Sequence, residues 1–259
     1  YPCIVKPNFS GGGSRGVALV KDFFELKTFL KKNHKFFLDG FLLLEEYIEG
    51  TEHTLEVLVY EGKTYLLSIS DKENYENSHS IVQNLYFPGP IGHLYYSKLK
   101  VLAELASNSL GLTYGTAHYE VIIKNDEPYL LEVGGRPGGG LNFYPICELS
   151  TGFDYPDLLA KVLTGKKPKL EKKESSHLAW HYFDYSGKGI IKNIDGLDSI
   201  SLNSKIISSC MYEKLGRPSI QPLNDLNRPG YILVKGDSHR QAKNLALKIC
   251  DKVKITIEN

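Results

Sequence analysis

Two glutamates, Glu120 and Glu132, have the spacing that points most directly to chemistry. The segments YEVIIK and PYLLEV read as two strands joined by a turn at residues 125–127, and both glutamates are equally far from the centre of that turn. They are therefore expected to face each other, at about 5 Å, where like charges destabilise a sheet. Mg²⁺ would remove the repulsion, because it commonly binds one or two carboxylates together with substrate phosphates. The sequence predicts a metal site at this pair; the alternatives are an exposed glutamate or a Lys or Arg side chain between the two.

The segment VGGRPGGGLN, residues 133–142, follows the second glutamate directly and places Arg136 on a glycine-bordered turn. A guanidinium group beside a metal site can grip the oxygens of a phosphate or a carboxylate. By itself the segment reads as a surface loop, so its interpretation as part of a site depends on the glutamates.

An earlier glycine-rich segment contains G-x-G-x-x-G at residues 11–16, the pattern of dinucleotide-binding loops. That pattern requires a helix directly after the glycines, whereas VALV follows here and favours a strand. A GK[ST] ending, which a Walker P-loop needs, is missing. We interpret the segment as a flap between two strands, with backbone N–H groups that approach phosphate oxygens and with Lys6 as a nearby point charge. A flexible hairpin tip with a solvated lysine is the alternative.

The segment EEYIEGTE, residues 45–52, connects an apolar strand to the next β region. A glutamate at a strand end can accept a hydrogen bond from an adenine amino group, while a backbone N–H further along donates to a ring nitrogen. The segment alone is weak evidence, because a surface loop between strands explains it equally well.

Helical periodicity and capping residues predict four helices, at residues 21–32, 97–111, 155–164 and 238–252. Asp22 is the expected N-cap of the first. Apolar residues in the first two helices are expected to face a core: Phe23, Leu26, Phe29, Leu30, Leu99, Leu102, Leu105, Ala106 and Leu110.

Strands are expected at residues 41–48, which read as buried, and in a hairpin over residues 53–71 that turns at Glu61-Gly62. Residues 74–92, rich in Asn, Ser, Pro and Gly, read as a loop that we interpret as a substrate lid. Beyond the polar run KKPKLEKKESS, further strands are expected at HLAWHYFDY and YILVKG.

Composition excludes several classes of partner. Lysine plus arginine (31) nearly balances aspartate plus glutamate (30), and the basic residues are dispersed, so we expect no nucleic-acid partner. The longest apolar stretch is shorter than a membrane span, so we expect no membrane partner. The four cysteines form no CxxC pair, which favours a reducing cytoplasm. The oligomeric state is not decided by the sequence, and a homodimer stays open.

In this order the motifs resemble those of the ATP-grasp superfamily: a strand lysine, a glycine flap, E-x-x-[IL]-x-x-x-E and two glutamates on a hairpin. The resemblance covers residues 1–165 and implies an α+β, ATP-grasp fold followed by a small C-terminal α/β domain. By analogy with D-alanine:D-alanine ligases and biotin carboxylases, it implies ATP and Mg²⁺ as cofactors, with Mn²⁺ as a substitute. The residues implied to bind the nucleotide are Lys6, Gly11, Gly12, Gly13, Ser14, Glu45, Glu46, Ile48 and Glu52, and those implied to bind the metal are Glu120 and Glu132.

The string GTAHYEVIIKNDEPYLLEVGGRPGG is similar to the L-amino-acid ligase branch, in which H-x-E, E-x-x-x-R and G-G recur. This resemblance implies that Arg136 stabilises the transferring phosphoryl group or the acyl phosphate, and that His118 lies near the substrate. The later segments GIIKNIDGLDSI and LNRPGYILVKGDSHRQAKNLA resemble the C-terminal domain of those ligases. The chain has Gly134 where the family often carries an asparagine. Because it begins with Tyr1 in a strand-like segment, we expect an upstream region, without which the chain folds but does not turn over.

The resemblance implies ATP-dependent carboxylate-amine ligation through an acyl phosphate, with amino acids as the expected small-molecule substrates. The expected domains are a small lid subdomain (1–48), a large subdomain with the metal site (49–165), a linker (166–176) and a C-terminal α+β domain (177–259). The alternatives are another ATP-grasp enzyme, such as a purine-pathway ligase or a biotin-carboxylase-like enzyme, and a non-catalytic ATP-binding module.

Overall fold

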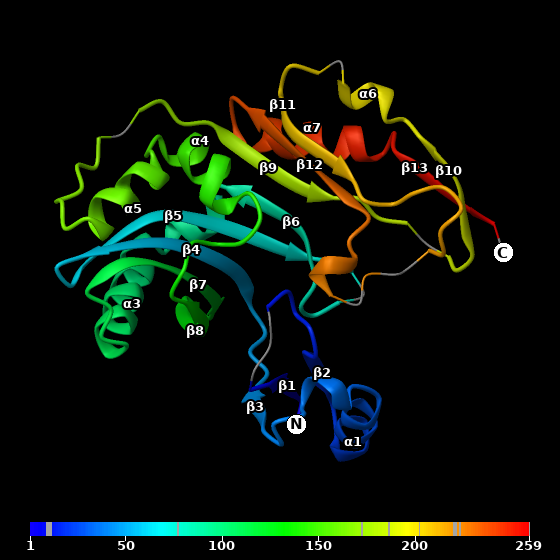
Figure 1. Ribbon diagram of the computed structural model, residues 1–259, viewed down its shortest axis with the longest axis horizontal. Coiled ribbons are helices and arrows are strands. Elements are labelled where there is room, and N and C mark those ends of the chain that lie inside the picture. The colour runs from blue at the N-terminus through cyan, green and yellow to red at the C-terminus, as the bar shows by residue number, and fades with distance from the viewer. Residues whose placement is uncertain are drawn as a thin grey trace.

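The computed structural model of the protein describes residues 1–8, 12–76, 78–171, 173–185, 187–201, 203–219, 222 and 224–258. Within them the strands form a three-stranded, an eight-stranded and a two-stranded sheet. The small sheet near the N-terminus lies below the large one in Figure 1, and the polypeptide between β3 and β4 joins the two sheets.

The small sheet has the strand order β2-β1-β3, and both strand pairs are antiparallel. Asp22 caps the following helix as expected, because its carboxylate accepts a hydrogen bond from the Glu25 N–H. Leu26 of that helix packs in a small core with Val5 and Val20. The elements of this part are β1 (Cys3–Pro7), β2 (Ala18–Val20), α1 (Phe23–Lys32), η1 (His34–Phe36) and β3 (Leu42–Glu46).

The large sheet has the strand order β11-β12-β9-β6-β5-β4-β7-β8, and all neighbouring strands are antiparallel. Its strands are β4 (Thr51–Tyr60), β5 (Lys63–Asn74), β6 (Val82–Phe87), β7 (Tyr114–Lys124), β8 (Glu127–Gly134), β9 (His177–Tyr182), β11 (Ile206–Met211) and β12 (Gly230–Gly236). The remaining strands, β10 (Ile190–Asp195) and β13 (Lys254–Glu258), pair with each other.

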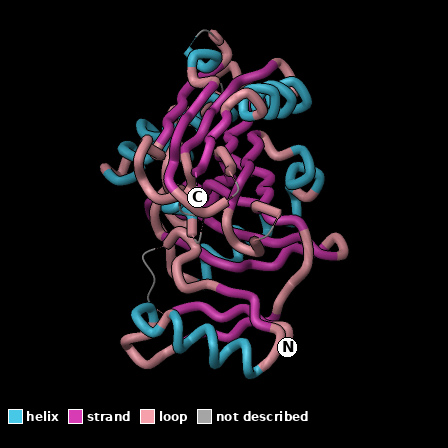
Figure 2. The backbone as a smooth tube through the Cα atoms, turned by 90° about the vertical axis from the view of Figure 1, so that its right-hand side faces the viewer, coloured by secondary structure: helices cyan, strands magenta, loops and turns pink. Residues whose placement is uncertain are grey.

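Helices cover the large sheet, as Figures 1 and 2 show. One core lies between α3 and strands β4, β5 and β7, a second includes α5 with β4 and β5, and a third lies between α7 and strands β9 and β12. The helices are α2 (Pro90–Leu94), α3 (Tyr96–Ser109), η2 (Asn142–Ile146), α4 (Cys147–Thr151), α5 (Tyr155–Leu163), α6 (Asp198–Ser201), η3 (Asp225–Asn227) and α7 (His239–Cys250). No helix in the described part of the chain is both long enough and apolar enough to cross a membrane.

The predicted buried face of α3 is partly wrong. Leu99 is fully buried, but Leu105 and Leu110 are 61% and 63% exposed. Ala106 is buried as predicted, and the small residues Ala103 and Ser107, which were not predicted, complete the buried face. The apolar content of α3 therefore exceeds what its buried face needs.

Two further expectations about apolar segments are wrong. Phe23 of α1 is exposed, and the strand at 41–48 is not buried, because Leu43 and Leu44 of β3 are about half exposed. These side chains belong to the small sheet, whose core holds few residues.

The prediction of a loop and substrate lid over residues 74–92 is wrong for most of that segment. Residues 82–87 form β6, which pairs with both β5 and β9 in the interior of the large sheet. Tyr86, expected in the lid, is 3% exposed. A strand with neighbours on both sides cannot open and close over a site.

The expected division of the chain into domains stays a prediction. Residues 166–171 and 173–176 carry no helix or strand, as expected of a connecting segment. However, β9 directly after this segment pairs with β6, so the sheet continues across the expected boundary.

Candidate functional site

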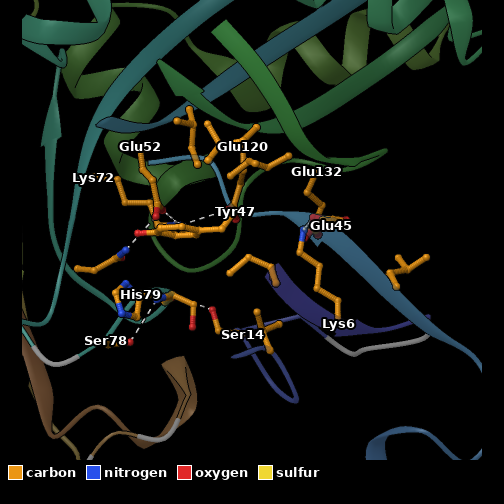
Figure 3. A pocket seen from close by; sticks show the side chains of 18 of the residues that line it. Lys6, Ser14, Glu45, Tyr47, Glu52, Lys72, Ser78, His79, Glu120 and Glu132 are labelled. Carbon is orange, nitrogen blue, oxygen red and sulfur yellow. Dashed lines mark hydrogen bonds and ion pairs between the residues drawn. The ribbon is translucent and has the colours of Figure 1, made fainter. Parts of the chain in front are cut away.

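A cleft of about 530 Å³ lies between the small sheet and the large sheet (Figure 3). With the exception of His118, every predicted site residue that the structure describes lines this cleft: Lys6, Gly12, Gly13, Ser14, Glu45, Glu46, Ile48, Glu52, Glu120, Glu132 and Arg136. Gly11 lies outside the described residues. The fold thus brings together residues that are up to 130 positions apart in the chain, while their individual roles stay predictions.

The glutamate pair has the predicted register. Glu120 on β7 and Glu132 on β8 are direct partners across the two strands. The turn is tighter than expected, since Lys124 already pairs with Glu127, and a one-residue shift after Glu120 restores the pairing. Both side chains therefore reach the same cleft.

Lys72 on β5 is a cleft residue that no sequence motif predicts. Its ammonium group lies 2.9 Å from a carboxylate oxygen of Glu52 and 2.9 Å from one of Glu120, and its side chain is 8% exposed. Burial acts to lower the pKa of Lys72, but the charges of Glu120 and Glu52 outweigh it and raise the pKa above its ordinary value. The charge of Lys72 in turn lowers the pKa of Glu120 to about 2. A buried cation thus contacts Glu120 and Glu52, rather than standing between Glu120 and Glu132.

The chemistry of the donor set fits Mg²⁺ bound jointly with phosphate. Among the described residues, no three His, Cys, Asp or Glu side chains form a cluster that could hold a metal ion by themselves. Glu120 and Glu132 supply two carboxylates at the cleft wall, and Mg²⁺ usually completes such a set with phosphate oxygens and water.

The glycine flap joins two strands, β1 and β2, and α1 begins only at Phe23. The dinucleotide-binding interpretation is therefore excluded, as the sequence predicts. Contacts hold the described part of the flap over the cleft: the Ser14 hydroxyl donates to the Ser80 carbonyl at 2.6 Å, and the Asp225 N–H donates to the Gly13 carbonyl at 3.0 Å. Asp225, a further cleft residue that no motif predicts, thus links the C-terminal part of the chain to the flap.

The small sheet presents Lys6 of β1 and Glu45 of β3 to the cleft, and their side chains form an ion pair of 2.6 Å. At the connection to the large sheet, the ring of Tyr47 packs edge-on against His79, with ring centroids 5.8 Å apart. Figure 3 shows these side chains opposite Glu52 and Glu120, so both sheets contribute charged groups to one space.

Arg136 lies in a tight turn after β8. Its N–H donates to the Gly134 carbonyl at 2.7 Å, and its guanidinium group donates to the Pro137 carbonyl at 2.9 Å. The residue is exposed and lines the cleft. A guanidinium group in this position can bind an anion next to the two glutamates.

His118 does not line the cleft. It is 8% exposed, and its Nδ1 lies 2.7 Å from Oε1 of Glu56, a buried residue that no motif predicts. Burial acts to lower the pKa of His118, but the Glu56 carboxylate outweighs it and raises the pKa. The expectation that His118 lies near a substrate stays a prediction, and its direct partner is a carboxylate of the sheet.

Comparisons with known proteins agree with this geometry. The family described as "ATP-grasp domain" matches residues 1–144, and "L-amino acid ligase C-terminal domain 2" matches residues 181–258. The crystal structure of L-amino acid ligase from Bacillus licheniformis is similar over 100% of this chain and 65% of that chain, with a TM-score of 0.83 and 25% identity.

Two curated relatives extend the comparison. The uncharacterized protein y4rH of Sinorhizobium fredii is 23% identical over 256 residues, which are 97% of this chain and 52% of the relative. A D-alanine–D-alanine ligase of Anaeromyxobacter sp. is 28% identical over 170 residues, which are 63% of this chain and 54% of the relative. The chain therefore spans about half the length of the curated relatives it matches.

Proposed function

The chain belongs to the ATP-grasp family. From that premise we propose that it forms part of an ATP-dependent carboxylate-amine ligase that joins amino acids through an acyl phosphate. The observation that carries the proposal is the meeting of the Glu120–Glu132 pair, Lys72 and Arg136 in one cleft. The match to an L-amino acid ligase C-terminal domain and the likeness to an L-amino acid ligase structure support the choice of substrates.

ATP is proposed to lie between the two sheets, because charged groups from both sheets face the same cleft. Lys6 and Lys72 supply positive charge for its phosphates, and Gly12, Gly13 and Ser14 cover them with backbone N–H groups. On the adenosine side, the residues proposed to bind are Glu45, Glu46, Ile48 and Glu52.

Glu120 and Glu132 would hold Mg²⁺, which when bound neutralises negative charge on the phosphates. When no metal ion is bound, the positive charge of Lys72 offsets the negative charges of the adjacent Glu52 and Glu120. The side chain of Lys72 is therefore already positioned at the place where phosphate charge would enter.

The proposed reaction proceeds in two displacements. A substrate carboxylate oxygen attacks the γ-phosphorus, and the bond to the bridging oxygen of ADP breaks. An amine then attacks the acyl carbon and loses a proton, and phosphate leaves with the former carboxylate oxygen. Such chemistry needs no protein nucleophile, because positioning and charge neutralisation carry most of it. Arg136 is proposed to stabilise the charge on the transferring phosphoryl group.

Isotope transfer tests this proposal. The full-length protein is supplied with an amino acid labelled with ¹⁸O in its carboxylate, with ATP and Mg²⁺, and with a second amino acid. The proposal predicts a dipeptide and one ¹⁸O atom in each released phosphate. Arg136→Ala should lower phosphate release about 100-fold, the scale at which loss of one charge-stabilising donor acts, while ATP still binds.

Other results would contradict the proposal in different ways. Phosphate release that requires bicarbonate instead of an amino acid would indicate a carboxylase-like enzyme. ATP binding without phosphate release under any pair of amino acids would indicate a non-catalytic module.

A further inference from the structure

The turn that carries Arg136 is held at two points of its backbone. At the first, Gly134 is the last residue of β8 and pairs with His118 on β7. At the second, the Gly138 N–H donates to Oε2 of Glu56 at 3.1 Å. Arg136 lies midway between these two points, so fixing both of them fixes the turn on which its side chain stands.

Glu56 makes the contact at the second of these two points. It is 3% exposed and lies on β4 directly opposite His118 of β7. Its carboxylate accepts hydrogen bonds from His118 Nδ1 at 2.7 Å, from the Gly138 N–H and from the Tyr155 hydroxyl at 3.4 Å. A carboxylate offers acceptors to all three donors, whereas a glutamine would present its own N–H₂ group to one side.

The backbone at Gly138 is in direct contact with this pair. A Cβ at Gly138 would clash with Oε1 of Glu56 and would lie 2.8 Å from Nδ1 of His118. For the next residue, Gly139, none of the residues that the structure describes comes within 4 Å of such a Cβ. The close approach is therefore confined to the residue whose N–H binds Glu56.

We propose that Glu56 and His118 are positioning residues for Arg136. They seat the Gly138 backbone against the sheet and so hold the Arg136 turn at the wall of the cleft. The role assigned to Arg136 rests on the proposed function, but the docking of the turn does not. Neither Glu56 nor His118 lines the cleft, so both act through the backbone of the turn and not on the substrate.

Amide hydrogen exchange over residues 134–141 tests the docking without any need for turnover. The variants Glu56→Gln and Gly138→Ala should exchange about ten- to a hundredfold faster than the wild type, the range that a hydrogen bond to a charged group represents. The matched control, Gly139→Ala, should exchange like the wild type. Unchanged exchange in Glu56→Gln, or equal exchange in Gly138→Ala and Gly139→Ala, would overturn the proposal. If Gly138→Ala does not fold, the exchange rates of Glu56→Gln and Glu56→Asp test the docking of the turn instead.

Kinetic coupling tests the link to Arg136. Glu56→Gln should lower kcat for ligation about tenfold or more without raising the KM for ATP, because the nucleotide groups of the cleft are untouched. Arg136→Ala should then cost much less in the Glu56→Gln background than in the wild type. An Arg136→Ala effect of the same size in both backgrounds would mean that Glu56 only supports the fold. Absent ligation by the full-length wild type would count against the proposed function, whereas unchanged exchange counts against the positioning role.

Discussion

Replacing Lys72 by methionine tests the charge balance of the cleft, because methionine keeps most of the volume and removes the charge. Breaking a fully buried ion pair costs about 3–5 kcal/mol, since it leaves an uncompensated charge. Here Glu52 and Glu120 are 19% and 35% exposed, so water screens part of the loss. We expect Lys72→Met to lower the free energy of unfolding at pH 7 by about 2 kcal/mol.

The loss should depend on pH in a defined direction. The charge of Lys72 lowers the pKa of Glu120 from 4.5 to about 2, against the effect of burial. A carboxyl group with a lowered pKa stabilises the folded state above the pKa of the unfolded chain, and this stability disappears as the pH falls through the lowered pKa. The wild type should lose this contribution between pH 4.5 and 2, and Lys72→Met should not.

Urea denaturation at pH 7 and pH 3 measures both quantities. The difference between the wild type and Lys72→Met should shrink by about half or more at pH 3. The control is Lys98→Met, because Lys98 is 46% exposed and forms a 2.5 Å ion pair with Glu127 at the surface; it should change stability by less than about 1 kcal/mol. A difference of equal size at both pH values would refute the assigned role of Lys72.

Three further predictions concern the orientation of α3, the burial of His181 and the closure of the flap. Leu99→Ala should destabilise the fold by about 2–5 kcal/mol in thermal or urea unfolding, because Leu99 is fully buried. Leu105→Ala on the same helix should lower the stability by less than about 0.5 kcal/mol. Equal losses in the two variants would contradict the orientation of α3. Burial lowers the pKa of His181 from 6.5 to about 4. The free energy of unfolding should therefore fall by up to about 3 kcal/mol as the pH drops from 6.5 to 4. Unfolding curves of His181→Gln should lack this part of the decline. Ser14→Ala removes the hydrogen bond to the Ser80 carbonyl, and stopped-flow measurement should find ATP dissociating about five times faster, since a neutral hydrogen bond contributes about 1 kcal/mol; an unchanged rate would argue against a closed flap.

The nucleotide-binding motifs could be predicted from the sequence because each is a short run of residues with a local geometric requirement. The flap needs glycines between two strands, and VALV after Gly16 already indicated β structure. The glutamate pair needs only a hairpin. The sequence predicts the pairing of the two glutamates correctly but not the turn, since the two-residue turn at Asn125-Asp126 and the register shift after Glu120 compensate each other.

Lys72 could not be predicted, because its position depends on a β-bulge. In the register set by the Tyr60–Lys63 pair at the turn, Glu52 would face Asp71. A register shift at Glu56 moves Lys72 opposite Glu52 instead, and therefore onto the cleft face of β5. A one-residue shift turns every following side chain to the other face of the sheet. No residue type in this hairpin predicts that shift.

Contacts between distant parts of the chain explain the other errors. The flanks of β6 are rich in turn residues and predict a loop, but β5 and β9 satisfy its backbone from both sides. Asp225 and Glu56 likewise reach the flap and the Arg136 turn only through tertiary packing. Such contacts have no local sequence pattern.

Titration of ATP in a calorimeter, with and without Mg²⁺, tests the central claim most directly, namely that Glu120 and Glu132 bind the metal that accompanies ATP in the cleft. In the wild type, Mg²⁺ should strengthen ATP binding by about tenfold or more, which is at least about 1.4 kcal/mol. In Glu132→Gln this gain should largely disappear, while the melting temperature without nucleotide stays that of the wild type. ATP binding that is equally tight without Mg²⁺, or a full Mg²⁺ effect in Glu132→Gln, would contradict the claim.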